Sequence, residues 1–144
     1  MNNCLHTADF FGWIMQQAAL LRAGRLTEID REHLAEEIED MGRSLQRELV
    51  NRLTVLLLHL LKWQFQPGYQ GNSWRYTIEE QREQLKDHLQ DNPSLKQKLP
   101  ESMERAYKYA RTGAAKETGL PKSIFPEECP WSFEQAFDDE FWPV

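Results

Sequence analysis

Apolar residues recur in steps of three and four along one long stretch of the chain, without a change of phase. The positions that carry this pattern are Leu34, Ile38, Met41, Leu45, Leu49, Leu53, Leu56, Leu60 and Trp63. Such spacing places side chains on one face of an α-helix, because a helix completes a turn about every 3.6 residues. The pattern predicts one helix from about Arg31 to Phe65, with Gly42 as the point at which it would bend or break.

The two halves of this predicted helix differ in character. The first half is amphipathic, whereas the second half, from Leu53 to Phe65, is apolar nearly all round. A helix without a polar face lies in the interior of a domain. We therefore expect the residues from Leu34 through Trp63 to form a central rod around which the remaining segments fold.

Shorter helices are predicted on both sides of this rod. Short oxygen-bearing side chains cap helix starts, and Gly or Pro ends helices. The predicted segments are Asp9–Arg22, ended by Gly24; Trp74–Gln90, capped by Ser73 and ended by Asn92 and Pro93; a segment that starts at Ser94, with its main helix from about Pro100 to Gly119; and Phe133–Phe137, capped by Ser132. No strand-like alternation persists for more than a few residues.

The C-terminal segment, residues 120–144, is rich in proline and in large aromatic side chains. The aromatic residues are Phe125, Trp131, Phe133, Phe137, Phe141 and Trp142. Six large aromatic side chains would expose much apolar surface if this segment were not packed against the protein. We therefore expect an extended tail packed on the core. The sequence thus predicts an all-α fold, a bundle of about four to five helices built around the long central helix. It also predicts a single domain over residues 1–144.

Composition narrows the class of protein and of partner. The chain has 144 residues, of which 40% are hydrophobic and 28% charged, as in globular domains. Its net charge of −6 disfavours nucleic acid as a partner. The basic positions of the fourth helix, Arg105, Lys108, Arg111 and Lys116, wander across its surface. Cys4 and Cys129 form no metal or redox motif, and no apolar run reaches the ~20 residues of a membrane span. We predict a cytoplasmic protein without a membrane partner.

A series of short motifs spread over nearly the whole chain resembles one bacterial family. The motifs are Asp9-Phe10 with Trp13, Gln17-Ala18, Leu20-Leu21-Arg22, Leu34-Ala35-Glu36-Glu37-Ile38-Glu39, Leu56-Leu57-Leu58-His59-Leu60-Leu61-Lys62-Trp63, Ser73-Trp74, Thr77-Ile78, Glu117-Thr118-Gly119-Leu120-Pro121, Phe125-Pro126, Cys129-Pro130 and Phe141-Trp142-Pro143. In combination they are similar to the family called domain of unknown function 29. The resemblance implies a mainly helical domain without an established activity, and it supplies no catalytic residues.

A basic and aromatic face is the main candidate for ligand binding. Its residues are Arg52, His59, Lys62, Trp63, Trp74 and Arg75. The first three share one face of the long helix, and the last two return near Lys62 after the turn. Basic groups on a partly buried face bind phosphate or carboxylate through charge-assisted hydrogen bonds. The alternative is structural, with the long cations extending to solvent and His59 bonded to a backbone carbonyl or a carboxylate.

Two other groups of polar residues receive no function. His33 and Glu37, one helical turn apart, could approach the same metal ion, but a solvated acidic helix start explains them equally well. No Glu-x-x-His motif of the di-metal bundles occurs, so no metal and no cofactor are predicted. His6 lies near the N-terminus, in a segment that we expect to be mobile.

The sequence lacks the common catalytic signatures. It contains no G-x-S-x-G, no H-E-x-x-H, no phosphate-binding glycine loop and no dinucleotide fingerprint. We therefore predict a non-enzymatic protein-interaction module, whose partner is another protein or a second copy of the chain. Two alternatives stay open: a small-molecule or anion-binding domain around His59, including an enzymatic one, and a less favoured nucleic-acid-associated protein.

Overall fold

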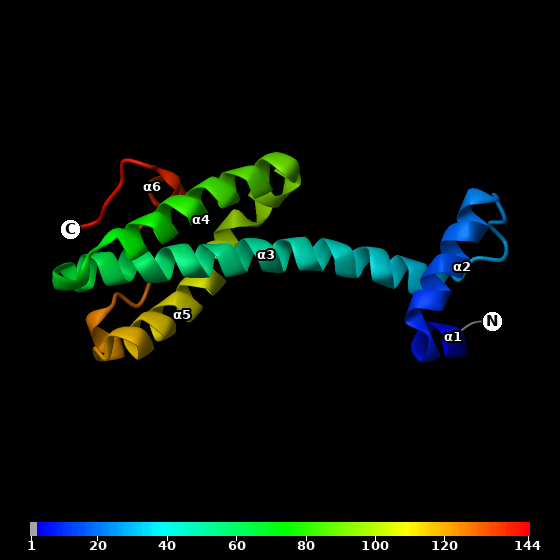
Figure 1. Ribbon diagram of the computed structural model, residues 1–144, viewed down its shortest axis with the longest axis horizontal. Helices are drawn as coiled ribbons and strands as arrows, with labels where there is room; N and C mark the ends of the chain where they lie inside the picture. Colours follow the sequence, from blue (N-terminus) through cyan, green and yellow to red (C-terminus); the bar gives the residue numbers. More distant parts are fainter. Residues whose placement is uncertain (1–2) are drawn as a thin grey trace. The chain divides into compact units, whose positions relative to one another are not determined.

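The fold is all-α, as the sequence predicts. The computed structural model describes residues 3–144, with side chains from Leu5 onward, and every regular element in that range is helical. The long helix, α3 (Arg31–Phe65), has the predicted bounds and continues through Gly42 without a break (Figure 1). None of the helices in this range combines the length and the apolar character needed to cross a membrane.

The chain divides into two compact units, Met1–Ser44 and Leu45–Val144. The N-terminal unit contains α1 (Asn3–Ala8), α2 (Phe10–Arg22) and the beginning of α3. Asp9 caps α2 as predicted, because its Oδ1 accepts a hydrogen bond from the Gly12 amide at 3.0 Å. Gly24 follows with φ of +72°, a left-handed conformation that glycine adopts without steric cost. It therefore lets the chain turn after α2.

In the C-terminal unit, α4 (Asn72–Asp91) and α5 (Leu99–Thr118) pack along the second half of α3 (Figure 1). Short 3-10 turns at Pro67–Tyr69, Pro93–Lys98 and Lys122–Ile124 complete the connections. The core of this unit contains the fully buried Leu53, Leu56, Leu57, Leu60 and Leu61 of α3, together with Ile78, Leu85, Ala106 and Ala110 from the flanking helices. The apolar second half of α3 therefore lies at the centre of this unit, as expected.

The expectation that burial extends along α3 from Leu34 is wrong. Side chains are fully covered only from Leu49 onward, whereas Ile38 and Met41 are 61% and 63% exposed and Leu45 is exposed as well. Regular apolar spacing shows that side chains share one face of a helix, but it does not show that the same chain covers that face. An apolar stripe on the N-terminal part of α3 is therefore open to solvent.

Helix α4 also begins differently from the prediction. Ser73 does not cap it, because the helix starts at Asn72 and the capping position is Gly71. The Ser73 carbonyl instead accepts a hydrogen bond from the Thr77 hydroxyl at 2.9 Å. A serine cap and a serine in the first turn are one residue apart, so the sequence alone does not separate them.

The C-terminal segment is part of the second unit and contacts its core. Helix α6 (Phe133–Phe137) starts at Ser132 with a reciprocal capping box to Gln135, and the capping serine was predicted. Phe125 and Trp131 are buried in the core. The Tyr107 hydroxyl donates to the Pro126 carbonyl at 2.6 Å. Burial raises the pKa of Tyr107 to about 12, so its hydroxyl keeps its proton and remains a donor.

Candidate functional site

The structure brings together only part of the predicted basic and aromatic face. Arg52 lies apart: its Nε is 3.0 Å from the Glu48 carboxylate, and its guanidinium also donates to the Gln84 side chain. The Nδ1 atom of His59 lies 2.8 Å from the Val55 carbonyl one turn earlier in α3. A carbonyl oxygen only accepts hydrogen bonds, so Nδ1 carries the proton. Burial lowers the pKa of His59, against the opposing hydrogen bond to Val55, and the ring is therefore neutral at pH 7.

The other four predicted residues meet where α3 passes into α4. Lys62 Nζ lies 2.8 Å from the Glu117 carboxylate and 4.7 Å from the centre of the Trp74 ring. The Arg75 guanidinium lies 6.0 Å from the Trp63 ring and 4.9 Å from the Trp142 ring. Lys62 is thus held by a carboxylate and an aromatic face, and Arg75 by two aromatic faces. An anion would have to compete with Glu117 for Lys62, and anion binding here remains a prediction.

Arg82, which the sequence analysis did not single out, is fully buried beside this group. Its Nε donates to the Ala136 carbonyl at 2.7 Å and its Nη2 to the Phe141 carbonyl at 2.6 Å. The guanidinium also lies 5.3 Å from the Trp142 ring. A sequence signal for this burial exists, because Arg82 is in phase with the inward-facing Ile78 and Leu85 of α4. The arginine fastens the C-terminal segment to α4.

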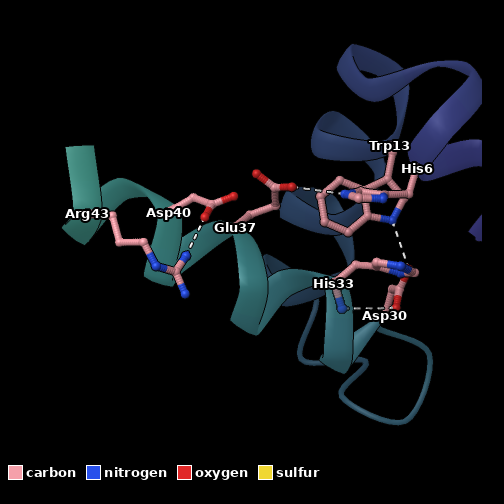
Figure 2. Close-up of polar contacts among 7 residues, drawn as sticks. All are labelled: His6, Trp13, Asp30, His33, Glu37, Asp40 and Arg43. Atoms are coloured by element: carbon pink, nitrogen blue, oxygen red, sulfur yellow. Dashed lines mark hydrogen bonds and ion pairs between the residues drawn. The ribbon is translucent and has the colours of Figure 1, made fainter. Parts of the chain in front are cut away.

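A second polar cluster lies where α1, α2 and α3 meet in the N-terminal unit (Figure 2). His6 Nε2 lies 3.0 Å from the Glu37 carboxylate. The His6 ring stacks on the His33 ring, with centroids 4.2 Å apart and planes 22° apart, and meets the Trp13 ring edge-on at 4.5 Å. His6 thus lies within α1 and in contact with both other helices, which contradicts the expected mobile terminus.

Asp30 holds the other side of this cluster together. Its Oδ2 accepts from the Trp13 indole N–H at 3.1 Å and lies 2.8 Å from His33 Nδ1. Its own amide donates to the Gln17 side-chain oxygen at 2.7 Å. Desolvation alone would raise the pKa of Asp30, but the hydrogen bonds from His33 and Trp13 outweigh it and lower the pKa below the ordinary value. The ionised carboxylate is therefore the form that joins α2 to α3.

The lowered pKa of Asp30 predicts acid sensitivity of the N-terminal unit. A depressed native pKa contributes stability that is complete above the unfolded-state value of about 3.9 and is lost as the pH falls through the native value. We expect the Trp13 indole N–H resonance to shift and exchange faster between about pH 5 and 2. In Asp30→Asn this acid-dependent change should be absent. An indole resonance that follows the same course in both proteins would contradict the assignment.

An apolar groove runs beside this cluster, between α2 and α3. Its lining consists of Phe10, Trp13, Ile14, Gln17, Ala18, Leu21, Leu34, Glu37, Ile38 and Met41, and its volume is about 330 Å³. Of the two polar lining residues, Glu37 is hydrogen-bonded to His6 and the Gln17 oxygen accepts from the Asp30 amide, whereas the buried Gln17 Nε2 has no partner among the described residues. The apolar spacing on α3 did not predict this groove, because the same positions were expected to lie in a closed core.

The described residues give no support to metal or thiol chemistry. No three His, Cys, Asp or Glu side chains among them converge as metal ligands. Burial raises the pKa of Cys129, and its thiol donates to the Trp131 carbonyl at 3.3 Å, so it is a poor nucleophile. The side chain of Cys4 lies outside the described residues.

Comparison with known proteins identifies the family of this chain. A search of curated proteins and a search of solved structures each found no match. The sequence profile of one family matches residues 5–142, which is nearly the whole chain and includes both units. This protein belongs to the family described as domain of unknown function DUF29.

Proposed function

We propose that this protein is an interaction module that binds the apolar face of a partner helix in the groove between α2 and α3. One observation carries the proposal: five large apolar side chains around the groove, Phe10, Ile14, Leu21, Ile38 and Met41, are each 41% to 63% exposed. A contiguous patch of exposed apolar side chains on a protein surface marks an interaction site. Isolated exposed apolar residues would carry no such meaning, but these five converge on one concave surface.

The chemistry of the groove favours binding over catalysis. Its lining is mainly hydrocarbon, Glu37 is hydrogen-bonded to His6, and the Gln17 oxygen accepts from the Asp30 amide. The buried polar atom of the lining without a partner among the described residues is Gln17 Nε2, an amide that serves neither as an acid or base nor as a nucleophile. A reaction site needs a polar group that is free to act on a substrate. An amphipathic helix needs only a complementary apolar groove, into which it places residues spaced three and four apart. We place this module in the reducing cytoplasm, where the free thiol of Cys129 is stable.

Site-specific photo-crosslinking in cells tests the proposal. A photoreactive amino acid replaces Ile38 in the groove, and a matched control replaces the exposed Tyr109 of α5. We expect the Ile38 protein to form one dominant covalent protein adduct, because a bound helix would lie against this position. The Tyr109 protein should form none of the same mass.

A charge substitution provides the second arm of this experiment. Met41→Glu places a carboxylate in the groove and should abolish the adduct, because the carboxylate would lose its hydration when a helix docks. Glu36→Gln, on the opposite face of α3, should leave the adduct intact. Absence of any adduct from Ile38, or an adduct that persists in Met41→Glu, would refute the proposed function.

A further inference from the structure

We infer that the occupant of this groove is the same surface of a second copy, so that two N-terminal units pair across α2 and α3. The inference rests on the proposed function, because it names the partner of the surface already described. Four features of the N-terminal unit carry it: its small interior, the area of the exposed apolar patch, the distribution of charge on α3, and a glycine without an internal role.

The N-terminal unit has very little interior of its own. Among its described side chains, only Trp13 and Gln17 are buried. Domains below about 40 residues usually need oligomerisation, a metal or a disulfide to become stable, and the unit Met1–Ser44 is close to that size. A partner that binds only from time to time would leave the apolar patch in water between encounters. A second copy is present whenever the chain itself is present, so it can cover this patch permanently.

The exposed apolar area matches what a dimer requires. Aromatic side chains bury about 150–250 Å² each, and the four aliphatic residues of the groove lie toward the lower end of that range. The exposed fractions of the five groove residues therefore leave roughly 400–500 Å² of apolar surface in water. A standard interface buries about 800 Å² per partner, and about 65% of a homodimer interface is apolar. About 500 Å² of apolar surface per copy is therefore what such an interface needs.

Most charges on the first half of α3 lie away from the groove. A helix turns about 100° per residue, which places Glu36, Asp40 and Arg43 on the side of α3 away from Ile38 and Met41. Asp40 and Arg43 also form an ion pair with each other (Figure 2). Glu37 is the carboxylate that lines the groove, and it is hydrogen-bonded to His6 within its own chain. Across a two-fold axis the surface meets its own copy, so the same patch supplies both faces of the interface and has to be complementary to itself.

Gly42 is next to Ile38 on the surface of α3 and has no evident role within one chain. Its φ is not among the positive glycine values, and a Cβ at this position would meet nothing within 4 Å. Glycine in a helix interior is unfavourable relative to alanine. Ala35, two helical turns earlier on the same side of α3, also has a small side chain. A missing side chain beside an open apolar stripe allows a second helix to approach closely.

The oligomeric state of the full chain is the direct test. Sedimentation equilibrium should give twice the chain mass of 17.0 kDa for the unaltered protein. Ile38→Glu should give the mass of one chain with its helical circular dichroism retained. Glu36→Gln, which changes charge on the opposite face of α3, serves as the matched control and should remain a dimer.

Substitutions of Gly42 separate an interface role from a structural one. Within one chain there is space at this position, so Gly42→Ala and Gly42→Leu should both raise the helix content of the monomeric Ile38→Glu protein. In the otherwise unaltered protein, Gly42→Leu should weaken dimerisation at least about tenfold because it fills the gap between the helices. A purely structural glycine would respond alike in both backgrounds.

The outcomes distinguish this inference from the proposed function. A protein that sediments as one chain at every concentration overturns the inference, and so does a dimer that survives Ile38→Glu. If such a monomer still forms an Ile38 photo-adduct with a different protein, the proposed function stands and the second copy is excluded. Loss of the dimer in Ile38→Glu, together with an adduct of exactly two linked copies, supports both.

Discussion

Replacing Arg82 by alanine should lower the free energy of unfolding of the C-terminal unit by about 3–5 kcal/mol. The substitution leaves the Ala136 and Phe141 carbonyls without their donors and opens a cavity beneath Trp142. Burial lowers the pKa of Arg82, opposed by Asp139 and Asp138, but an arginine keeps its proton in proteins. Arg82 is therefore always a positively charged hydrogen-bond donor, and its bonds to the Ala136 and Phe141 carbonyls hold the segment after α5 against α4.

The measurement is urea unfolding, together with hydrogen exchange in residues 133–142. Arg75→Ala is the matched control, because Arg75 also stacks on Trp142 but is exposed. The control should cost less than about 1 kcal/mol, as is usual for surface substitutions. Arg82→Met restores much of the volume but not the donors, so exchange in residues 133–142 should remain fast. A loss below 1 kcal/mol for Arg82→Ala would show that the segment is held mainly by its aromatic side chains.

The sequence predicted helices more reliably than it predicted what covers them. The uninterrupted apolar spacing predicted both ends of α3 correctly, and Ser132 predicted the residue at which α6 begins. Helix periodicity, however, is a property of one segment, whereas burial depends on the apolar surface that other segments provide. Apolar residues before Leu49 on α3 have the right spacing, but no other described segment covers them. The stripe that includes Ile38 therefore lines an open groove.

The candidate binding face shows the same limit for polar residues. Lys62, Trp74 and Arg75 were expected to meet because they flank one turn, and their aromatic contacts lie there. Arg52 shares the helical face of Lys62, but ten residues along a helix separate them by about 15 Å. Arg52 therefore forms hydrogen bonds with other residues, Glu48 and Gln84. A shared face places residues in a line and does not gather them at one point.

The His6 contacts were beyond sequence reasoning for a different reason. His6 belongs to a helix of six residues, too short to give a periodic pattern. Its partner Glu37 is 31 positions away along the chain. Nothing local distinguishes such a histidine from one in a frayed terminus, because only the packing of α1 against α2 and α3 brings the rings together.

Replacing Trp13 by alanine should detach α1 and α2 from α3, because Trp13 is the largest buried side chain of the N-terminal unit. Truncation of so large a buried ring costs about 3–5 kcal/mol, and Gln17 is the other side chain that the described part of this unit buries. Hydrogen exchange should therefore rise through residues 10–22 and stay slow in residues 53–63. Trp13→Phe keeps an aromatic ring but loses part of the ring volume and the hydrogen bond to Asp30, so it should cost less than Trp13→Ala. Phe11→Ala, at an exposed site, is the control; an equal effect from it would mean that general apolar contact, rather than the Trp13 contacts, holds the unit together.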